Sequence, residues 1–301
     1  MLLTRILTAA VVLLVLVLVA GWATAPLFHG VLLLILAIAA YEWLVLLSVS
    51  RLRALFISVL FIGVGVAALL SSPVMVEVTA GRGRDLLAVY GLVSIFWIAI
   101  APFSLQRFSP LGERRLAGKL FALFLLFATW LALVQADGLG KVFLLSVLLI
   151  VWVADTAAYF AGRAFGQRKL ALRISPGKTW EGAMGALVGT LLLAVAMVLW
   201  GERSHDAALT PALALTDQNL FYMLKEAVGW VPMLLIVVLL TFLSILGDLY
   251  ESLLKRLAGV KDSGRVLPGH GGVLDRIDAL IPVFPVTMFL VSLFESGWVF
   301  P

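Results

Sequence analysis

The residues best suited to chemistry lie between positions 252 and 278, where charges and glycines separate two long apolar segments. Asp275 and Asp278 are three positions apart, so on a helix their Cβ atoms would lie about 5–6 Å apart on one face. Mg²⁺ prefers oxygen ligands and usually shares its coordination shell with substrate phosphates. The spacing therefore predicts a magnesium site that acts on a phosphate-bearing substrate. The other ionisable residues of this segment are Lys255, Arg256, Lys261, Asp262, Arg265, His270 and Arg276.

A glycine-rich stretch, PGHGG at 268–272, precedes the two aspartates. Gly271 and Gly272 would let backbone N–H groups approach a phosphate closely, with His270 beside them. The alternative is an ordinary capped and salt-bridged loop, since neither the GHGG nor the DRID tetrapeptide is specific alone. Their occurrence together favours a phosphate site.

A third carboxylate, Asp248, lies near the end of the preceding apolar segment. Ser252 and Lys255 follow it at spacings of four and three, so all three residues share one face of a helix. Asp248 would join Asp275 and Asp278 in an all-oxygen Mg²⁺ site. We therefore predict these three carboxylates as metal ligands, with Ser252 in support.

Asp155 lies inside another apolar segment, VWVADTAAYFAGRAFG. A carboxylate in a membrane span is costly and marks a functional site by default. The alternative is a hydrogen bond that holds two helices together, made with Thr156 or Tyr159.

The stretch SPGKTWEG at 175–182 carries a further basic residue, Lys178. A P-loop is excluded because that motif requires a glycine at the position of Leu172 and a preceding strand. We predict instead a proline turn at a helix N-terminus, where free N–H groups favour anions. Lys178 would contact phosphate; the alternative is a capped helix with a basic loop residue. Ser175, Thr179 and Glu181 are predicted to support this site.

The rest of the chain is mostly hydrocarbon: 63% of residues are hydrophobic and 13% charged, with a mean hydropathy of +1.12. This excludes a soluble domain, for which about half apolar and a quarter charged is usual. A spanning helix needs about 20 apolar residues. We predict an all-α polytopic membrane protein with nine spans, near 5–25, 27–47, 53–71, 86–103, 119–135, 140–161, 182–200, 230–250 and 279–297.

The basic residues predict the orientation of these spans. With the N-terminus in the cytoplasm and the C-terminus outside, 17 of the 22 Lys and Arg residues fall in cytoplasmic segments, as the positive-inside rule requires. The net charge of +5 therefore describes a cytoplasmic face and indicates no nucleic-acid partner. Residues 1–25 are expected to be a retained helix rather than a signal peptide. The absence of cysteine excludes disulfides and thiolate metal ligands.

The chain is predicted to be a single integral-membrane domain over 1–301. Polar residues are sparse in 1–135, which we expect to be scaffold and lipid-facing helices, and frequent in 150–280, which we expect to carry the site. Residues 201–229 are expected to be an outer connector. A homodimer would suit the featureless first part.

The run from Ser252 to Asp278 resembles the signature of the phosphatidate cytidylyltransferases, or CDP-diacylglycerol synthases. The residues that carry the resemblance are SxLKR at 252–256, KDxG at 261–264 and LPxHGGVxDRID at 267–278. The stretch at 175–182, the Gly247–Asp248 step and the Asp155 region resemble the family as well. The motifs cover about 150–280, and the length and hydropathy of the whole chain agree.

The resemblance implies transfer of a cytidylyl group from CTP to phosphatidic acid, giving CDP-diacylglycerol and pyrophosphate. It implies Mg²⁺ as the cofactor and leaves open whether a second cation binds. It implies a multi-pass protein among the lipids of a bacterial inner membrane, with its active site on the cytoplasmic face. The implied catalytic residues are Asp248, Lys255, Asp275, Asp278 and His270, of which the three aspartates bind metal. The implied phosphate contacts are Lys178, Lys255, Arg256, Lys261, Arg276, Gly271 and Gly272, supported by Asp155, Ser252 and Asp262.

Two other classes remain open at this stage. An ion-coupled transporter would use Asp155 and the DRID pair as coupling groups, but it predicts mid-membrane charges in both halves, and the first half offers little besides Glu42. A CTP-dependent lipid-alcohol kinase would release CDP and a phosphorylated alcohol. The CDP-alcohol phosphatidyltransferases carry a DGxxAR motif that this chain lacks.

Overall fold

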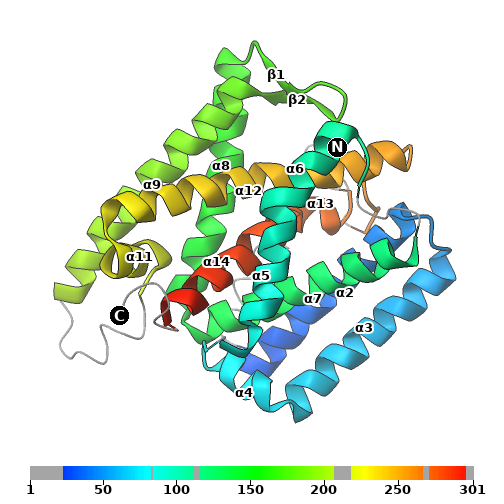
Figure 1. Ribbon diagram of the computed structural model, residues 1–301, viewed down its shortest axis with the longest axis horizontal. Helices are drawn as coiled ribbons and strands as arrows, with labels where there is room; N and C mark the ends of the chain where they lie inside the picture. Colours follow the sequence, from blue (N-terminus) through cyan, green and yellow to red (C-terminus); the bar gives the residue numbers. More distant parts are fainter. Residues whose placement is uncertain (1–22, 83, 111–114, 207–217, 267–270, 296–301) are drawn as a thin grey trace.

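Apolar segments become helices because a helix satisfies every backbone N–H and C=O within itself, as hydrocarbon surroundings require. The structure, a computed structural model, describes residues 23–82, 84–110, 115–206, 218–266 and 271–295 (Figure 1). Within these ranges seven helical segments are long and apolar enough to cross a membrane. They are α2 (Ala25–Leu46), α3 (Arg51–Ser71), the composite Leu87–Arg107, α7 (Leu116–Gly138), α8 (Lys141–Phe165), α9 (Trp180–Asp206) and α12 (Trp230–Leu257).

These helices confirm the predicted all-α polytopic membrane fold. The composite segment consists of α5 (Leu87–Ile95), the π-helical turn η2 (Phe96–Ile100) and α6 (Ala101–Arg107). The predicted first span lies almost wholly outside the described residues. The count of nine spans and the orientation of the termini stay predictions.

The last predicted span, 279–297, is described as far as Glu295. It is α14 (Leu280–Glu295), an apolar helix of 16 residues with Pro285 in its interior. A separate short helix, α13 (Leu274–Ile277), precedes it. Asp275 and Asp278 therefore do not share one continuous helix, as the spacing had suggested, because the chain turns between α13 and α14.

Two further predictions were wrong in detail. Residues 175–179 form a strand rather than a proline turn: β2 (Ser175–Thr179) pairs antiparallel with β1 (Lys169–Ala171), in the register Lys169 opposite Thr179 and Ala171 opposite Ser175. The segment 201–229, predicted to be a connector, is partly helical. It contains the end of α9 and the helix α11 (Leu220–Val228), whose Asn219 cap accepts a hydrogen bond from the Tyr222 amide at 3.0 Å.

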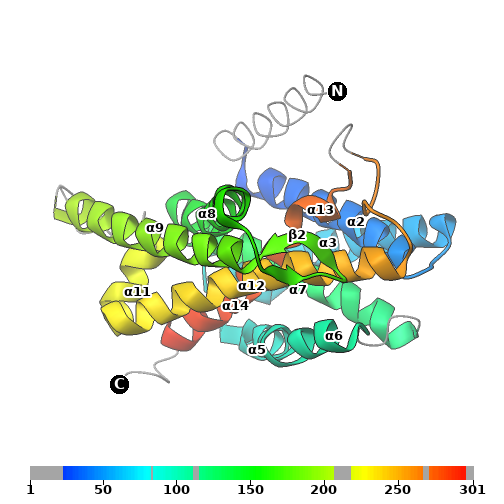
Figure 2. The same cartoon turned by 90° about the horizontal axis from the view of Figure 1, so that it is seen from above.

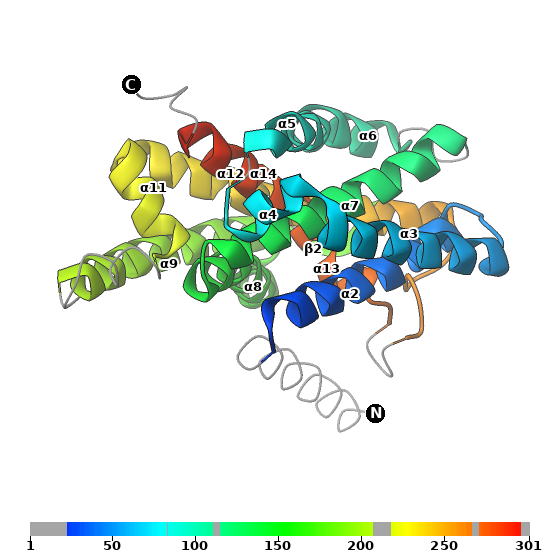
Figure 3. The ribbon, with the colours of Figure 1, turned by 90° about the horizontal axis from the view of Figure 1, so that it is seen from below.

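The helices lie in layers. Figures 2 and 3 show α12 and α14 between α5–α6 on one side and α2 with α8 on the other. Large side chains such as Trp97, Trp130 and Phe284 fill the centre and are fully buried. The edge helices α3 and α9 leave apolar side chains exposed, as helices that face lipid do. The short helix α4 (Pro73–Thr79) and the turn η1 (Arg84–Leu86) link α3 to α5.

Glycines allow the site-bearing helices to approach one another closely. A Cβ on Gly182 of α9 would lie 2.9 Å from the Ala158 carbonyl oxygen of α8, and a Cβ on Gly247 of α12 would lie 2.5 Å from the Asp278 carbonyl oxygen. Real Cβ atoms do not approach this closely, so these contacts depend on small residues. They bring α8, α9, α12 and the α13–α14 turn together.

Candidate active site

A pocket of about 420 Å³ lies where α8, the β1–β2 hairpin, the start of α9 and α12 meet. Asp155, Lys178 and Asp248 are in its wall, and Tyr159 and Arg163 line it as well. The Arg163 guanidinium donates a hydrogen bond to the Tyr159 hydroxyl at 2.9 Å. The structure thus brings together three residues that were predicted from separate parts of the sequence.

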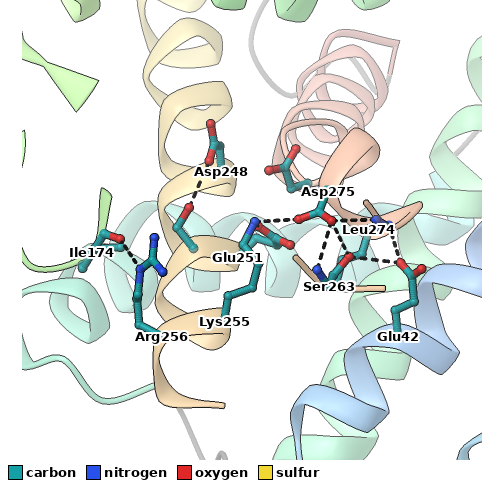
Figure 4. Close-up of polar contacts among 12 residues, drawn as sticks. Glu42, Ile174, Asp248, Glu251, Lys255, Arg256, Ser263, Leu274 and Asp275 are labelled. Atoms are coloured by element: carbon teal, nitrogen blue, oxygen red, sulfur yellow. Dashed lines mark hydrogen bonds and ion pairs between the residues drawn. The ribbon is translucent and has the colours of Figure 1, made fainter. Parts of the chain in front are cut away.

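Asp248 is held at the pocket wall by two neighbours. Lys178 Nζ lies 2.7 Å from Asp248 Oδ2, and the Ser252 hydroxyl donates to Asp248 Oδ1 at 3.3 Å (Figure 4). The second contact confirms that Asp248 and Ser252 share a face of α12. Lys178 also lies 3.5 Å from the Ile245 carbonyl oxygen, so its ammonium is fixed beside the carboxylate.

Asp278 lies at the turn between α13 and α14, where its Oδ1 accepts a hydrogen bond from the Ala279 amide at 2.8 Å. Burial raises the pKa of the Asp278 carboxyl well above its usual range, and the nearby Asp248 carboxylate raises it further. Lys178 acts in the opposite direction. The Asp248 and Asp278 carboxyls are therefore close enough to disfavour each other's charge, and a cation bound beside them would favour the charged form of both.

Asp275 is the centre of a different network. Its Oδ1 lies 2.6 Å from Lys255 Nζ. Its Oδ2 accepts from the Ser263 amide and hydroxyl, both at 3.0 Å, and from the Gly272 amide at 2.8 Å (Figure 4). Burial would raise the pKa of this carboxyl, but its hydrogen bonds and its position beside Glu251 and Lys255 outweigh burial and lower the pKa to about 2. Asp275 thus ties α12 to both ends of the glycine-rich loop.

The predicted phosphate-binding cations lie in two settings. Lys255 contacts both Glu251 and Asp275, while Arg256 Nε donates to the Ile174 carbonyl oxygen at 3.1 Å and joins α12 to the hairpin (Figure 4). Lys261, its neighbour Asp262 and Arg276 are exposed. Gly271 has a φ of 80°, a backbone conformation that favours glycine. His270 lies outside the described residues.

The residues around Lys178 are mainly structural. The Thr179 hydroxyl accepts a hydrogen bond from the Gly182 amide at 3.1 Å and so caps α9. Glu181 accepts from the Gln167 and Arg168 amides at 3.1 and 3.2 Å, which fixes the link between α8 and β1. Ser175 begins β2 and is half-buried. Together they fix the hairpin that presents Lys178.

A family model described as "Cytidylyltransferase family" matches residues 3–294 of the chain. The chain belongs to the cytidylyltransferase family. The match covers the part that was expected to be scaffold as well as the polar clusters.

Curated relatives from this family are similar over part of their length. A phosphatidate cytidylyltransferase of Haemophilus influenzae is 42% identical over 140 residues, which are 46% of this chain and 42% of that protein. One from Pseudomonas aeruginosa is 41% identical over 144 residues, 48% of this chain and 44% of the relative. One from Staphylococcus saprophyticus is 33% identical over 204 residues, 68% of this chain and 59% of the relative. The chain thus spans less than half the length of the first two relatives.

The three carboxylates predicted to bind magnesium can be compared with the needs of that ion. Among the described residues no group of three His, Asp or Glu side chains is arranged to hold a metal ion by itself. The three predicted ligands are divided, because Asp275 is engaged with Ser263, Gly272 and Lys255 while Asp278 lies near Asp248. This donor set fits Mg²⁺, which is commonly held by one or two carboxylates together with substrate phosphates and water.

Two buried acids near these networks carried no predicted role. Glu251 is one helical turn before Lys255 on α12, and Glu42 is on α2; they are 3% and 1% exposed. A feature of the sequence could have indicated each of them. Glu251 is four positions before Lys255, a spacing typical of a helical ion pair, and Glu42 is a carboxylate inside an apolar span. Glu42 reaches the glycine-rich loop from the part of the chain that was expected to be scaffold.

Proposed function

We propose that this protein transfers the cytidylyl group of CTP to phosphatidic acid, giving CDP-diacylglycerol and pyrophosphate, at a Mg²⁺-dependent site on the cytoplasmic face of a bacterial inner membrane. Family membership and the names of the relatives support the reaction. The observation that carries the proposal is the pocket between α8, the hairpin and α12, where Asp155, Lys178 and Asp248 meet inside an apolar helix bundle. Such a site suits two phosphate-bearing substrates, one of which is a lipid.

The reaction needs little from a general base. A phosphomonoester has a second pKa of about 6, so the lipid phosphate is mostly dianionic at neutral pH. One of its oxygens would attack the α-phosphorus of CTP and form the new P–O bond, while the bond to the β-phosphate breaks and pyrophosphate leaves with the electron pair. The enzyme must mainly align two polyanions and stabilise their charge.

The acidic residues would supply the protein part of the metal site. We propose that Asp248 and Asp278 hold the Mg²⁺ ion, which would neutralise phosphate charge when bound. The unfavourable pairing of these carboxylates supports that assignment. Asp275 remains a predicted ligand through Oδ1. Because this oxygen contacts Lys255, Asp275 would reach an ion only after Lys255 had turned toward a phosphate.

The basic residues would hold the phosphates. Lys178 and Lys255 each pair with an aspartate, which orients the ammonium groups and keeps them desolvated. Both are partly buried, with side chains 24% and 14% exposed, so an arriving phosphate could replace the carboxylate as partner. Gly271 would offer its backbone amide, whereas the predicted contact at Gly272 would require its amide to leave Asp275. Lys261 and Arg276 would add positive charge from exposed positions.

The substrates explain a site at the membrane surface. CTP is dissolved in the cytosol, while phosphatidic acid keeps its acyl chains in the bilayer and its headgroup at the interface. The basic residues that follow α8 and α12 support a cytoplasmic orientation through the positive-inside rule. In Figure 1 the hairpin after α8 and the end of α12 lie toward the same side of the bundle.

The decisive experiment is an assay of purified protein with CTP, Mg²⁺ and phosphatidic acid, scored for CDP-lipid and pyrophosphate. Stoichiometric release of both is expected, with little product when ATP replaces CTP or when EDTA removes the metal. Inverted membrane vesicles should use externally added CTP, whereas right-side-out vesicles should not.

Three results would overturn the proposal. CDP together with a phosphorylated lipid alcohol would indicate a CTP-dependent kinase. Ion flux in reconstituted vesicles without any CTP-dependent lipid product would indicate a transporter. Use of CTP only by right-side-out vesicles would reverse the orientation.

A further inference from the structure

Glu42 connects α2 to the glycine-rich loop from more than 200 positions away in the sequence. Its Oε2 accepts a hydrogen bond from the Leu274 amide at 2.7 Å and lies 3.2 Å from the Ser263 hydroxyl, whose single proton it shares with Asp275 Oδ2 (Figure 4). Ser263 and Leu274 lie on opposite sides of the loop. One carboxylate on α2 therefore bridges the segment that enters the loop and the segment that leaves it.

Glu42 also explains two glycines of the loop. A Cβ on Gly264 would collide with Glu42 Oε1, and a Cβ on Gly272 would lie 2.5 Å from Glu42 Oε2. Neither glycine has a positive φ, so the backbone conformation alone does not require glycine at these positions. The lack of side chains at 264 and 272 leaves the space that the Glu42 carboxyl group fills.

The network continues from Glu42 to the predicted ligands. Ser263 contacts both Glu42 Oε2 and Asp275 Oδ2, and Gly272 donates to Asp275 Oδ2. Asp275 in turn contacts Lys255 of α12. Glu42, Ser263, Asp275 and Lys255 thus form a continuous series of polar contacts from α2 to α12 (Figure 4).

We propose that Glu42 is a positioning residue for the active site: it clamps the segment Ser263–Gly264 to the segment Gly272–Leu274, so that Asp275 and Lys255 face the substrate phosphates. Glu42 does not touch substrate. It acts as a hydrogen-bond acceptor and as the side chain that fills the space beside Gly264 and Gly272. The activity part of this inference rests on the proposed function, but the clamp itself does not.

Hydrogen exchange measures the clamp without any assay of activity. Glu42→Ala removes the acceptor of the Leu274 amide, so exchange in 263–275 should become at least about tenfold faster. Glu42→Gln keeps an acceptor oxygen and should remain within about threefold of the unsubstituted protein. His29→Ala is the matched control, because His29 is also buried on α2 but contacts Asp137 rather than the loop; it should leave exchange in 263–275 unchanged. Unchanged exchange in Glu42→Ala would overturn the proposal.

The space-filling role has its own test in a double-mutant cycle. Gly264→Ala should displace Glu42 and lower kcat/KM for CTP by about tenfold or more, whereas in a Glu42→Ala background the same substitution should cost less than about threefold. If Gly264→Ala lowered kcat/KM by the same factor with Glu42 present and with Glu42 replaced, the proposal would be overturned. If Glu42→Ala does not fold, the test uses Gly264→Ala alone. This variant should accelerate exchange of the Leu274 amide, which lies on the opposite side of the loop. A Leu274 amide that stayed protected would overturn the proposal.

The kinetic pattern separates positioning from general stability. Glu42→Ala should lower kcat/KM for CTP by about 30-fold or more at temperatures where the protein remains folded, and Glu42→Gln should restore most of it. Loss of activity only in parallel with loss of folded protein would contradict a positioning role. If the unsubstituted protein forms no CDP-lipid, the proposed function fails, and the exchange measurement still decides whether Glu42 holds the loop.

Discussion

Lys178 Nζ and Asp248 Oδ2, 2.7 Å apart, join strand β2 to helix α12 at the wall of the pocket. Their side chains are 24% and 34% exposed, so the pair is neither sealed in the interior nor free in solvent. An ion pair that solvent still reaches contributes little to stability, typically less than about 1 kcal/mol. Under the proposed function, the pair would orient Asp248 for a cation and Lys178 for a phosphate.

This relationship predicts how substitutions of the pair combine. Lys178→Ala and Asp248→Asn should each lower kcat/KM by about 100-fold or more, because each removes charge stabilisation from the transition state. The exchanged pair, Lys178→Asp with Asp248→Lys, should remain as inactive as the single variants. Steady-state kinetics on the four proteins tests this. Recovery of activity in the exchanged pair would show that only the ion pair matters.

Asp278→Asn should raise the Mg²⁺ concentration needed for half-maximal activity by about 10-fold or more, because Asp278 is a proposed ligand and its charge is removed. Asp275→Asn should act mainly through the loop that it holds, raising KM for CTP. A Mg²⁺ titration at saturating CTP separates the two effects. Glu77→Gln is the control. Glu77 is a half-exposed acid of α4 that pairs with Arg82, so this variant should behave like the unsubstituted protein. An unchanged Mg²⁺ requirement in Asp278→Asn would exclude Asp278 as a ligand.

The pKa of Asp275 predicts a pH dependence of stability. The folded-state pKa is about 2, below the value of about 3.9 for an unfolded chain. A lowered pKa stabilises the folded state above pH 3.9, and this stabilisation disappears as the pH falls toward 2; it amounts to about 2 kcal/mol at neutral pH. The stability difference between the unsubstituted protein and Asp275→Asn should therefore be constant from pH 7 to 5 and shrink below pH 4. Chemical unfolding in detergent measures this difference in the free energy of unfolding. If the difference already became smaller between pH 7 and 5, the lowered pKa of Asp275 would be contradicted.

The sequence predicted the membrane fold because apolar stretches of about 20 residues have few alternatives to helix in hydrocarbon. It also predicted that Asp155, Lys178 and Asp248 serve one site, since charges amid apolar segments are costly unless they are used. The pocket that these three residues line is consistent with that inference. Local spacing was enough to predict the Asp248–Ser252 contact, because both residues lie on one helix.

Long-range contacts escaped the sequence analysis. The spacing of Asp275 and Asp278 suggested a shared face, but the turn before α14 gives them different partners. Strand β2 was missed because SPGKT contains proline and glycine, which are poor strand formers, and only pairing with β1 makes it a strand. The contact of Glu42 with Leu274 joins residues whose separation in sequence gives no periodic signal.

Gly247 immediately precedes Asp248, and its lack of a side chain lets α12 meet the α13–α14 turn. A Cβ at this position would lie 2.5 Å from the Asp278 carbonyl oxygen and 2.9 Å from Pro282 Cγ. Both obstacles are rigid, one being backbone and the other a proline ring in α14. Gly247→Ala should therefore push the two elements apart, destabilise the protein by about 1–3 kcal/mol and separate Asp248 from Asp278.

The expected result for Gly247→Ala is a lower unfolding temperature together with a higher Mg²⁺ requirement in the protein that remains folded. Gly63→Ala is the matched control, because a Cβ on Gly63 of α3 meets nothing within 4 Å and alanine favours a helix over glycine by up to about 1 kcal/mol. This variant should be as stable as the unsubstituted protein or more so, with an unchanged Mg²⁺ requirement. If Gly247→Ala bound Mg²⁺ normally, the close approach of α12 to the turn would not be what brings the two carboxylates together.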